Sequence, residues 1–210
     1  MIRRYRGRAR GRRRPFMYVP PAPRAVSSEA VPLYRAIIGS IERDGWTVVG
    51  IEPDGTSDRP GRIFTVGLIE TFQHAELLVF GAVCEPILSA LKRLAGQVQQ
   101  GRGALPLNTP IAQAFGKLPG TLKVVAPEIG GPYAGIAQSR AQQLGLPFSL
   151  LQLVRPDQLG RFAWEPGFDH SLDSHQPALY DRVPGRVVAL DPLRRRSRPG
   201  RAPHTSGWRP

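Results

Sequence analysis

The sequence of 210 residues has one cysteine, three lysines and no long apolar run. Cys84 has no second cysteine with which to form an internal disulfide, and this fits a reducing compartment. No stretch reaches the roughly 20 consecutive apolar residues of a membrane-spanning helix, and no apolar run follows the N-terminal arginines as a secretory signal requires. We therefore expect a cytoplasmic protein with no membrane anchor.

Acidic residues are absent from both ends of the chain, where arginine is abundant. The formal net charge is +13, yet residues 1–24 hold nine arginines and residues 192–210 hold six, with no acid in either segment. The remainder carries 14 basic and 16 acidic residues. The charge of the central part is therefore close to neutral.

Arginine-rich ends mixed with Pro and Gly cannot bury enough apolar surface to offset chain entropy, so we predict two disordered tails. We place them at residues 1–27 and 183–210, around a single globular domain at 28–182. Such tails can contact nucleic acid weakly and without sequence preference, through phosphates. The alternative is compositional: with arginine in place of lysine, as in a GC-rich genome, extensions drift towards Arg and Pro and have no function.

Hydrophobic periodicity in the central part predicts interleaved helices and strands. We expect helices over residues 32–44, 86–100 and 133–144, and strands over residues 46–51, 62–69, 77–81, 121–126 and 149–154. The first two strands are predicted to pair as a long-looped hairpin. A hairpin within an alternating pattern favours an α+β fold, with a two-layer mixed sheet packed by about three helices.

Two segments carry a resemblance to a known family. The first is Phe64-Thr65-Val66-Gly67-Leu68 with its continuation to Leu77, and the second runs from Leu151 through Pro156-Asp157 to Asp169. Together with Gly45-Trp46, they resemble the bacterial family known as domain of unknown function 4262, over roughly residues 34 to 180. The family name implies a fold but no reaction, and it therefore assigns no catalytic residue.

A second, shorter likeness covers Thr65 to Leu78. A Thr-x-Gly-Leu strand, a polar loop and an acidic residue before a Leu-rich strand are similar to the suppressor-of-fused class. Many bacterial members of that class look like immunity proteins that bind toxins. This likeness implies a protein-binding module with a toxin-like partner and no chemistry of its own.

Thr65 and Gly67 form one candidate binding surface. In a strand they would share a face, and a glycine inside a strand suits the close approach of a ligand or of another backbone. The small residues would make a floor on which a ligand rests. The alternative is that a helix packs tightly over Gly67.

His74 is a candidate catalytic residue, with Glu70 and Glu76 close to it in the sequence. A histidine between carboxylates can carry a proton, with one acid orienting the ring. The His-x-Glu pattern lacks the further Cys or His ligands of a zinc site, so we predict no metal. The alternative is an ordinary surface histidine. Cys84 is interpreted as a buried small hydrophobe, although a helix N-terminus can lower the pKa of a thiol.

The loop after the last predicted strand concentrates polar and aromatic residues. Asp157, Arg161, Trp164 and Glu165 lie between glycines and prolines, and binding residues often gather in such loops. The alternative is that the aromatic residues clamp the loop to the body while Asp157 and Arg161 pair within it. We further predict that this loop folds over Gly67, so that both segments line one cleft.

These observations favour a ligand-binding or protein-binding module. The alternative is a small enzyme in which His74 carries a proton and Arg161 holds an anionic substrate. The sequence identifies no cofactor, substrate or partner.

Overall fold

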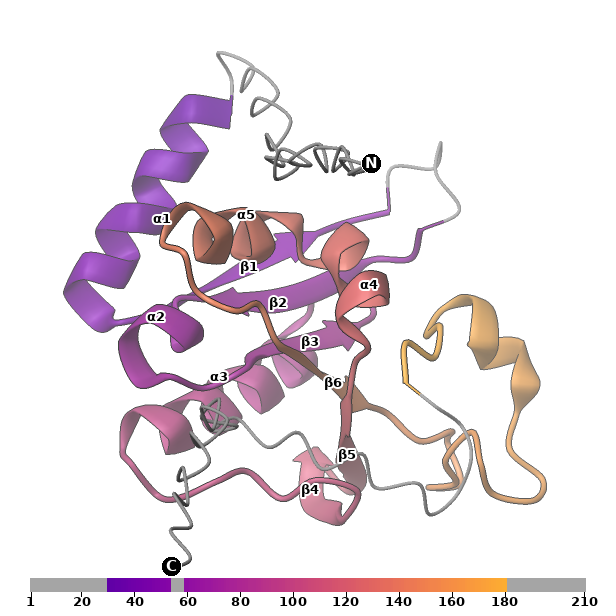
Figure 1. Ribbon diagram of the computed structural model, residues 1–210. Helices are drawn as coiled ribbons and strands as arrows, with labels where there is room; N and C mark the ends of the chain where they lie inside the picture. Colours follow the sequence, from indigo (N-terminus) through magenta and orange to yellow (C-terminus); the bar gives the residue numbers. More distant parts are fainter. Residues whose placement is uncertain (1–29, 54–58, 181–210) are drawn as a thin grey trace, which may run out of the picture.

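The computed structural model describes residues 30–53 and 59–180, and both predicted tails lie outside these ranges. Six strands form one sheet in the order β1-β2-β3-β6-β5-β4 (Figure 1). All neighbouring strands are antiparallel except β3 and β6, which are parallel. The strands are β1 (Thr47–Ile51), β2 (Arg62–Val66), β3 (Glu76–Phe80), β4 (Pro110–Phe115), β5 (Leu118–Val124) and β6 (Leu150–Val154).

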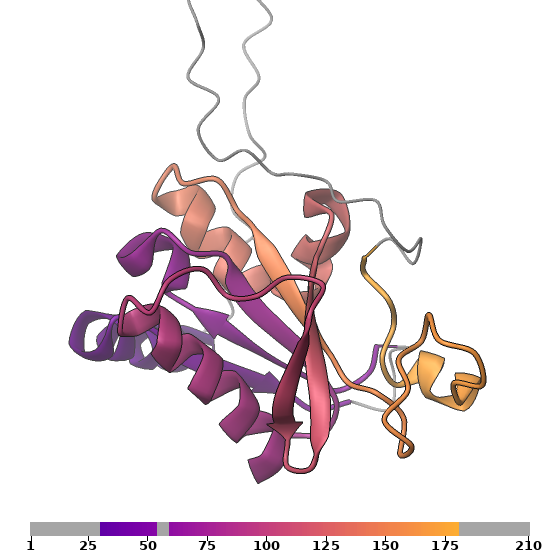
Figure 2. The same ribbon diagram turned by 90° about the horizontal axis from the view of Figure 1, so that it is seen from below.

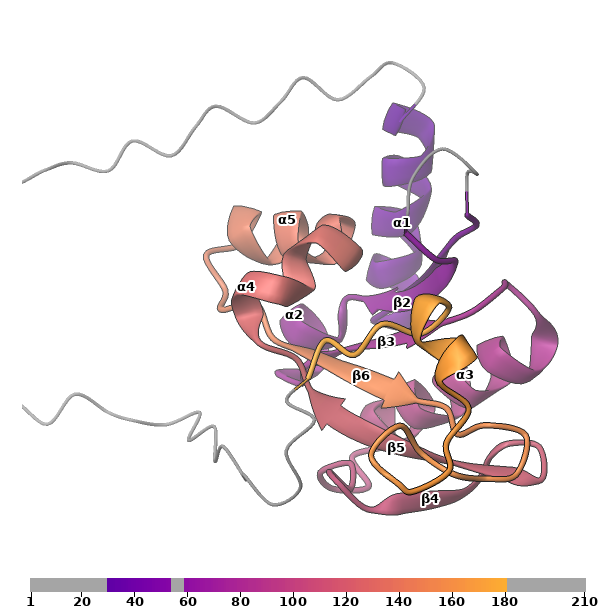
Figure 3. The same ribbon diagram turned by 90° about the vertical axis from the view of Figure 1, so that its right-hand side faces the viewer.

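Helices cover both faces of this sheet. Figure 1 and Figure 3 show α1 and α5 on one side and α3 on the other. Two short helices, α2 and α4, and the 3-10 helix η1 lie in connections between the longer elements. A second 3-10 helix, η2, lies in the segment after β6. The helices are α1 (Ala30–Asp44), α2 (Leu68–Phe72), α3 (Glu85–Gln99), α4 (Pro127–Gly130), η1 (Gly131–Tyr133), α5 (Gly135–Gln143) and η2 (His170–Ser174).

The α+β class, the mixed sheet and the hairpin of β1 with β2 are confirmed. The sheet with helices on both of its faces makes three layers, one more than predicted, because the central strands are apolar on both faces. Every residue of β2, β3 and β6 is buried. A strand that is buried on both faces needs a covering layer on each side.

Each face of the sheet has its own apolar core. On one face, Leu91 and Leu94 of α3 belong to a cluster with Leu77 and Val79 of β3. On the other face, Ile37 and Ile41 of α1 belong to a cluster with Phe80 of β3. The predicted apolar face of α3 is therefore confirmed, and β3 lies at the centre of both cores.

The strand predicted over residues 62–69 ends early, at Val66. Gly67 has φ +113°, which breaks the strand geometry, and α2 begins at the next residue. A Cβ atom on Gly67 would lie 2.8 Å from the carbonyl oxygen of Gly45 and 2.9 Å from Cα of Trp46. Glycine is thus required here by a close backbone and by the left-handed conformation. Thr65 and Gly67 do not form the predicted continuous floor.

The sequence analysis missed β4, which lies at one edge of the sheet. This strand begins with Pro110, and its register shifts between Ile111 and Phe115, around Gln113 with φ +54°. An edge strand tolerates a proline and a bulge because one side of its backbone needs no partner.

The parallel pairing of β3 with β6 divides the molecule into two ends. Glu76 pairs with Leu150, so β3 and β6 begin at the same side of the sheet. We call this side the Glu76 end and the side where both strands stop the Arg155 end. The helix α2 lies at the Glu76 end, and the segment after β6 lies at the Arg155 end (Figures 1 and 2). None of the described helices has the length and apolar character to cross a membrane.

Candidate functional site

Glu76 is buried at the start of β3, with 2% of its surface exposed. Its Oε2 accepts a hydrogen bond from the Thr65 hydroxyl at 2.6 Å, and its Oε1 accepts from the N–H groups of Gly67 and Ile69 at 2.9 and 3.2 Å. The Thr65 oxygen in turn accepts from the N–H of Leu77 at 2.8 Å. Burial raises the pKa of Glu76, and the hydrogen bonds offset only part of this rise.

Glu70 of α2 forms an ion pair with Arg140 of α5. Nε and Nη2 of Arg140 lie 3.0 and 2.9 Å from Oε2 of Glu70. Burial acts to lower the pKa of Arg140, but the hydrogen bond and charge of Glu70 outweigh it and raise that pKa. The space between Glu70, Glu76 and Arg140 measures only about 10 Å³. This volume holds about one water molecule and no larger ligand.

His74 lies close to the two glutamates in sequence but is not joined to them. Its Nδ1 lies 2.7 Å from the carbonyl oxygen of Ala75. Among the described residues, no hydrogen bond connects the ring to Glu70 or Glu76. Oε2 of Glu70 is bonded to Arg140 and Oε2 of Glu76 to Thr65, while the buried Oε1 of Glu70 has no partner in the described part of the chain. The role of His74 as a proton carrier stays a prediction, and the orienting carboxylate that it needs has other partners.

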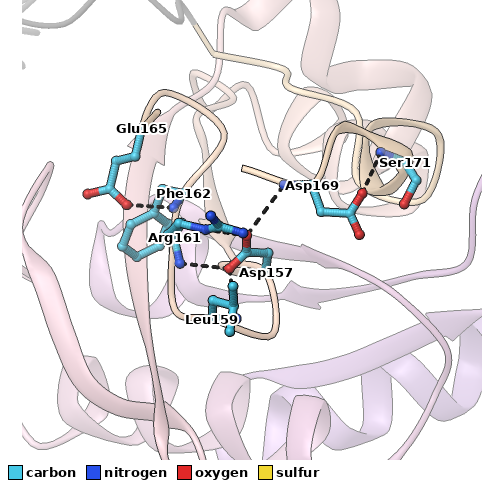
Figure 4. Close-up of polar contacts among 7 residues, drawn as sticks. All are labelled: Asp157, Leu159, Arg161, Phe162, Glu165, Asp169 and Ser171. Carbon is cyan, nitrogen blue, oxygen red and sulfur yellow. Dashed lines mark hydrogen bonds and ion pairs between the residues drawn. The ribbon is translucent and has the colours of Figure 1, made fainter. Parts of the chain in front are cut away.

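Asp157 organises the loop that follows β6 (Figure 4). Its Oδ1 accepts hydrogen bonds from the N–H groups of Leu159 and Arg161, both at 2.9 Å. Its Oδ2 accepts from Nε of Arg161 at 2.9 Å and from the N–H of Asp169 at 3.4 Å. Burial acts to raise the pKa of Asp157, but hydrogen bonds from Arg161 and Leu159 and the charge of Arg161 outweigh it and lower that pKa. Asp157 and Arg161 are therefore engaged with their own loop.

Trp164 and Glu165 also bind within this region. Trp164 stacks on Phe162 with ring centroids 4.8 Å apart, and Tyr180 meets it edge-on at 5.9 Å. The Nζ of Lys123 on β5 lies 4.1 Å from the centroid of the Trp164 ring. Oε2 of Glu165 accepts from the N–H of Phe162 at 2.7 Å. This is the clamping arrangement that the sequence analysis considered as the alternative.

The predicted shared cleft between this loop and Gly67 is wrong. Gly67 follows β2 at the Glu76 end, whereas the loop leaves β6 at the Arg155 end. The two segments are separated by the length of the sheet because β6 runs parallel to β3. Trp164 packs instead in an apolar cluster with Val154 of β6, Phe162 and Tyr180.

A cavity of about 710 Å³ opens at the Arg155 end, where β3 and β6 stop. Its walls come from the segment before β2, the connection between β3 and α3, the residue after β6, and η2 with its neighbour. The lining residues are Pro53, Arg59, Pro60, Gly61, Gly81, Ala82, Cys84, Ile87, Arg155, Leu172, Ser174 and His175.

Two glycines, Gly61 and Gly81, form the sheet end of this cavity. The N–H of Gly81 donates to the carbonyl oxygen of Gly61 at 2.8 Å. Gly81 has φ +137°, and a Cβ atom there would lie 2.6 Å from Ile87 and 3.4 Å from Cζ and Nη2 of Arg155. The absence of a side chain at Gly81 therefore makes room for the guanidinium group of Arg155.

Arg155 is the residue immediately after β6, and its main chain is held on both sides. The N–H of Arg155 donates to Oε1 of Gln176 at 2.8 Å, and Nε2 of Gln176 donates to the Arg155 carbonyl oxygen at 2.8 Å. Gln152 makes a similar pair of bonds with Pro177 and Leu179. These two glutamines attach the segment after η2 to β6, and thereby position η2 beside the cavity.

Cys84 also lines this cavity. It is exposed, so its interpretation as a buried hydrophobe is wrong. It precedes the first residue of α3 and has an extended backbone. The sequence analysis missed Arg155 and His175 as site residues. The sequence does show that a basic residue, Arg155, follows an apolar strand. It does not show that the end of β3, at Gly81, lies beside this residue.

Metal-binding geometry is not present among the described residues, where no three His, Cys, Asp or Glu side chains gather. The polar groups around the cavity are two guanidinium groups, one imidazole, one hydroxyl and one thiol. Arg59 is partly engaged, since its Nη1 donates to the Pro132 carbonyl oxygen at 3.0 Å. The arrangement suits the binding of an uncharged or negatively charged group.

Comparison with known proteins gives a family for this chain. The family described as "Domain of unknown function (DUF4262)" matches residues 40–169, so the chain belongs to it. No curated protein and no solved structure matches the chain. The matched range includes both ends of the sheet, with Gly81, Cys84 and Arg155, and stops just before η2.

Proposed function

We propose, for a member of a family whose description names no reaction, that this protein is a binding module for a small molecule. The observation that carries the proposal is the cavity of about 710 Å³ at the Arg155 end. Small-molecule sites in proteins have volumes of roughly 300 to 1,000 Å³ and combine apolar walls with a few polar groups. The lining of Pro, Ile and Leu side chains with two arginines agrees with that pattern.

The position of the cavity in the sheet supports the same proposal. Ligands of sheets with parallel strands bind outside the carboxyl ends of those strands, where the following connections diverge. Only one pair of strands in the described sheet is parallel, β3 with β6. After Phe80 the chain turns into α3 on one face, and after Val154 it enters the loop that leads to η2. The cavity lies between these two connections.

A groove of about 690 Å³ between β1 and α3 is the competing location. It is lined by both Asp44 and Lys92, and the indole N–H of Trp46 on its wall donates to Gln99 at 3.1 Å. Its charged groups have opposite signs and do not select one kind of ligand. The Arg155 end is therefore the stronger candidate.

The enzyme alternative with His74 receives less support. That mechanism needs a carboxylate beside the imidazole, and Glu70 and Glu76 are bonded to Arg140 and Thr65. The adjoining space of about 10 Å³ has no room for a substrate. A binding module requires only the cavity.

The test uses phenylnaphthylamine, an uncharged apolar dye that becomes fluorescent in apolar sites. Ser174→Trp places a large ring in the cavity, and Ser139→Trp places the same ring on the exposed side of α5 as the matched control. We expect the dye to bind the wild type and Ser139→Trp alike, and Ser174→Trp to reduce the fluorescence gain at least about fivefold, since the ring fills space that the ligand needs. Equal binding by both variants would place the dye elsewhere and contradict the proposal.

The single cysteine provides a second, independent block. Because Cys84 is exposed and lines the cavity, a bulky maleimide should attach there alone and should abolish dye binding. Cys84→Ser should bind the dye normally and should be insensitive to the maleimide. Normal dye binding after complete labelling would show that the dye does not occupy the cavity.

A further inference from the structure

We propose that the cavity at the Arg155 end selects an organic anion, with a carboxylate, sulfonate or phosphate group bound to Arg155 and an apolar body against Ile87 and Leu172. This inference rests on the proposed function and adds the chemical class of the ligand. It makes Arg155 the residue that recognises charge.

The hydrogen-bonding state of Arg155 is the first argument. Its side chain is half-buried, and its Nε is fully buried with no hydrogen-bond partner among the described residues. A buried donor without a partner destabilises the folded chain, and more strongly so when the group is charged. Arg62 of β2 and Arg140 of α5, by contrast, have partners in the protein. An anion in the cavity would pair with the outer nitrogens of the guanidinium group, because the enclosed Nε lies out of the reach of a ligand.

The charges around the cavity are the second argument. The described lining has three basic residues, Arg59, Arg155 and His175, and no carboxylate. Asp173 is adjacent in sequence to Ser174, and its Oδ2 lies 3.1 Å from Nδ1 of His170, outside the cavity. The described lining is therefore basic, and such a lining attracts a negative group more than a neutral or positive one.

Burial of the guanidinium group is consistent with this assignment. Burial lowers the pKa of Arg155, and the nearby Cys84 sulfur acts in the opposite direction. Loss of solvation thus disfavours the charged form of Arg155. An anion bound at hydrogen-bond distance would stabilise that charged form by charge-assisted hydrogen bonds.

The shape of the lining indicates what the rest of the ligand is. Pro53, Pro60, Ile87 and Leu172 are the larger apolar residues around the cavity, while Gly61 and Gly81 leave its sheet end without side chains. A fully hydrophilic anion such as free phosphate would leave these apolar walls unused. An anion with an aromatic or aliphatic body would use the charge and the apolar surface together.

Two dyes that differ by one sulfonate group test the inference. Phenylnaphthylamine is uncharged, and anilinonaphthalene sulfonate has the same ring system with one sulfonate group. Both are titrated into the full chain, into Arg155→Met and Arg155→Lys, and into Arg102→Met as a matched control. Arg102 is exposed on the connection after α3, so its loss leaves the cavity intact and removes the same net charge.

We expect the wild type to bind the sulfonate dye at least about tenfold more tightly than the uncharged dye, since a charge-assisted pair adds this much affinity. Arg155→Met should remove that difference while binding of the uncharged dye changes less than about twofold, and Arg155→Lys should restore part of it because lysine keeps the charge but not the forked donors. Arg102→Met should behave as the wild type, which also accounts for dye bound elsewhere on the chain.

The outcomes separate the two proposals. If the wild type binds the uncharged dye in the cavity but shows no preference for the sulfonate, the anion inference is overturned and the binding module remains. A preference that survives in Arg155→Met also overturns it. If blocking the cavity by Ser174→Trp affects neither dye, the proposed function itself fails. Thermal unfolding of each variant establishes that it is folded. If Arg155→Met does not fold, the test uses Arg155→Lys, and a preference for the sulfonate equal to that of the wild type would then overturn the inference.

Discussion

The two ends of the β3–β6 pair treat buried charge in opposite ways. At the Glu76 end, the carboxylate of Glu76 accepts hydrogen bonds from Thr65, Gly67 and Ile69, and the remaining space is about 10 Å³. At the Arg155 end, Nε of Arg155 has no partner among the described residues, and the adjoining space is about 710 Å³. Where the chain satisfies its own charged group, that group stabilises a turn. Where it does not, the group is free to recognise a ligand.

This comparison changes how the polar residues of the sequence are interpreted. Thr65 and Glu76, which were candidates for two different roles, are bonded to each other and to backbone. Asp157 and Arg161 are also bonded to each other, in the loop that carries the second family segment. Polar residues that have each other as partners hold the protein together. An unpaired polar group is the better indicator of a binding site where it also borders a large cavity, as Arg155 does and Glu70 does not.

The strongest test of the Glu76 end is Glu76→Ala. This change leaves the Thr65 hydroxyl and two N–H groups buried without their acceptor, so we expect it to lower the free energy of unfolding by about 3 kcal/mol. Chemical denaturation of the wild type and variant measures the difference. Glu128→Ala on α4 is the control: Glu128 is exposed, and its loss should change the stability by less than about 0.5 kcal/mol. Equal effects of the two changes would mean that the network around Glu76 contributes nothing.

Glu76→Gln tests the charge apart from the hydrogen bonds. The ordinary pKa of this carboxyl group is 4.5, and burial raises it in the folded chain. The folded state therefore binds the proton more tightly than the unfolded state, so the related stability is complete below about pH 4.5 and is lost as the pH rises through the raised pKa. We expect the stability of the wild type relative to Glu76→Gln to fall as the pH rises from 4.5. A difference that is constant with pH would contradict the raised pKa.

A smaller, local effect is expected at the Arg155 end from Asp157→Asn. The amide can replace only one of the two acceptor oxygens, so the bonds from Arg161 and Asp169 to Oδ2 should be lost. Amide hydrogen exchange should become faster at Leu159, Arg161 and Asp169, while β3 and β6 keep their protection. Because the pKa of Asp157 is lowered in the folded loop, the wild type should show the same loosening as the pH falls through that lowered pKa, below the ordinary pKa of this carboxyl group.

The result for Asp157→Asn also tests how the cavity wall is fixed. Gln176 and Gln152 attach the following segment to β6 by bonds that do not involve Asp157. Binding of phenylnaphthylamine should therefore remain when the Asp157 loop loosens. Loss of dye binding would mean that this loop positions η2 as well.

Much of the fold could be predicted because apolar residues recur at regular intervals. The face of α3 that contains Leu91 and Leu94 and the apolar strand β3 were clear from periodicity alone. The short helix α2 was not, because Gly67 stops the strand through its contact with Gly45, which is 22 residues away in the chain. The strand β4 was missed because its proline and bulge are permitted only by its position at the sheet edge.

The candidate site could be predicted only in part, for a topological reason. The sequence identified β6 and the polar loop after it, but it did not determine whether β6 runs parallel or antiparallel to β3. With an antiparallel β6, the loop would have reached Gly67 as predicted. The parallel pairing places Arg155 beside Gly81 instead, and no local pattern contains that information.

The smallest effect is expected from His74→Ala, which asks whether the Glu76 end has any chemistry of its own. His74 is half-buried, and its ring makes one hydrogen bond, to the Ala75 carbonyl oxygen, so the loss should cost less than about 1 kcal/mol in denaturation. Leu91→Ala in the core should cost about 2 to 5 kcal/mol. Both dyes should bind His74→Ala within about twofold of the wild type, because the ring lies at the opposite end of β3 from the cavity. If dye binding is lost while the fold is intact, the ligand site belongs at the Glu76 end, and His74 regains its interpretation as a functional residue.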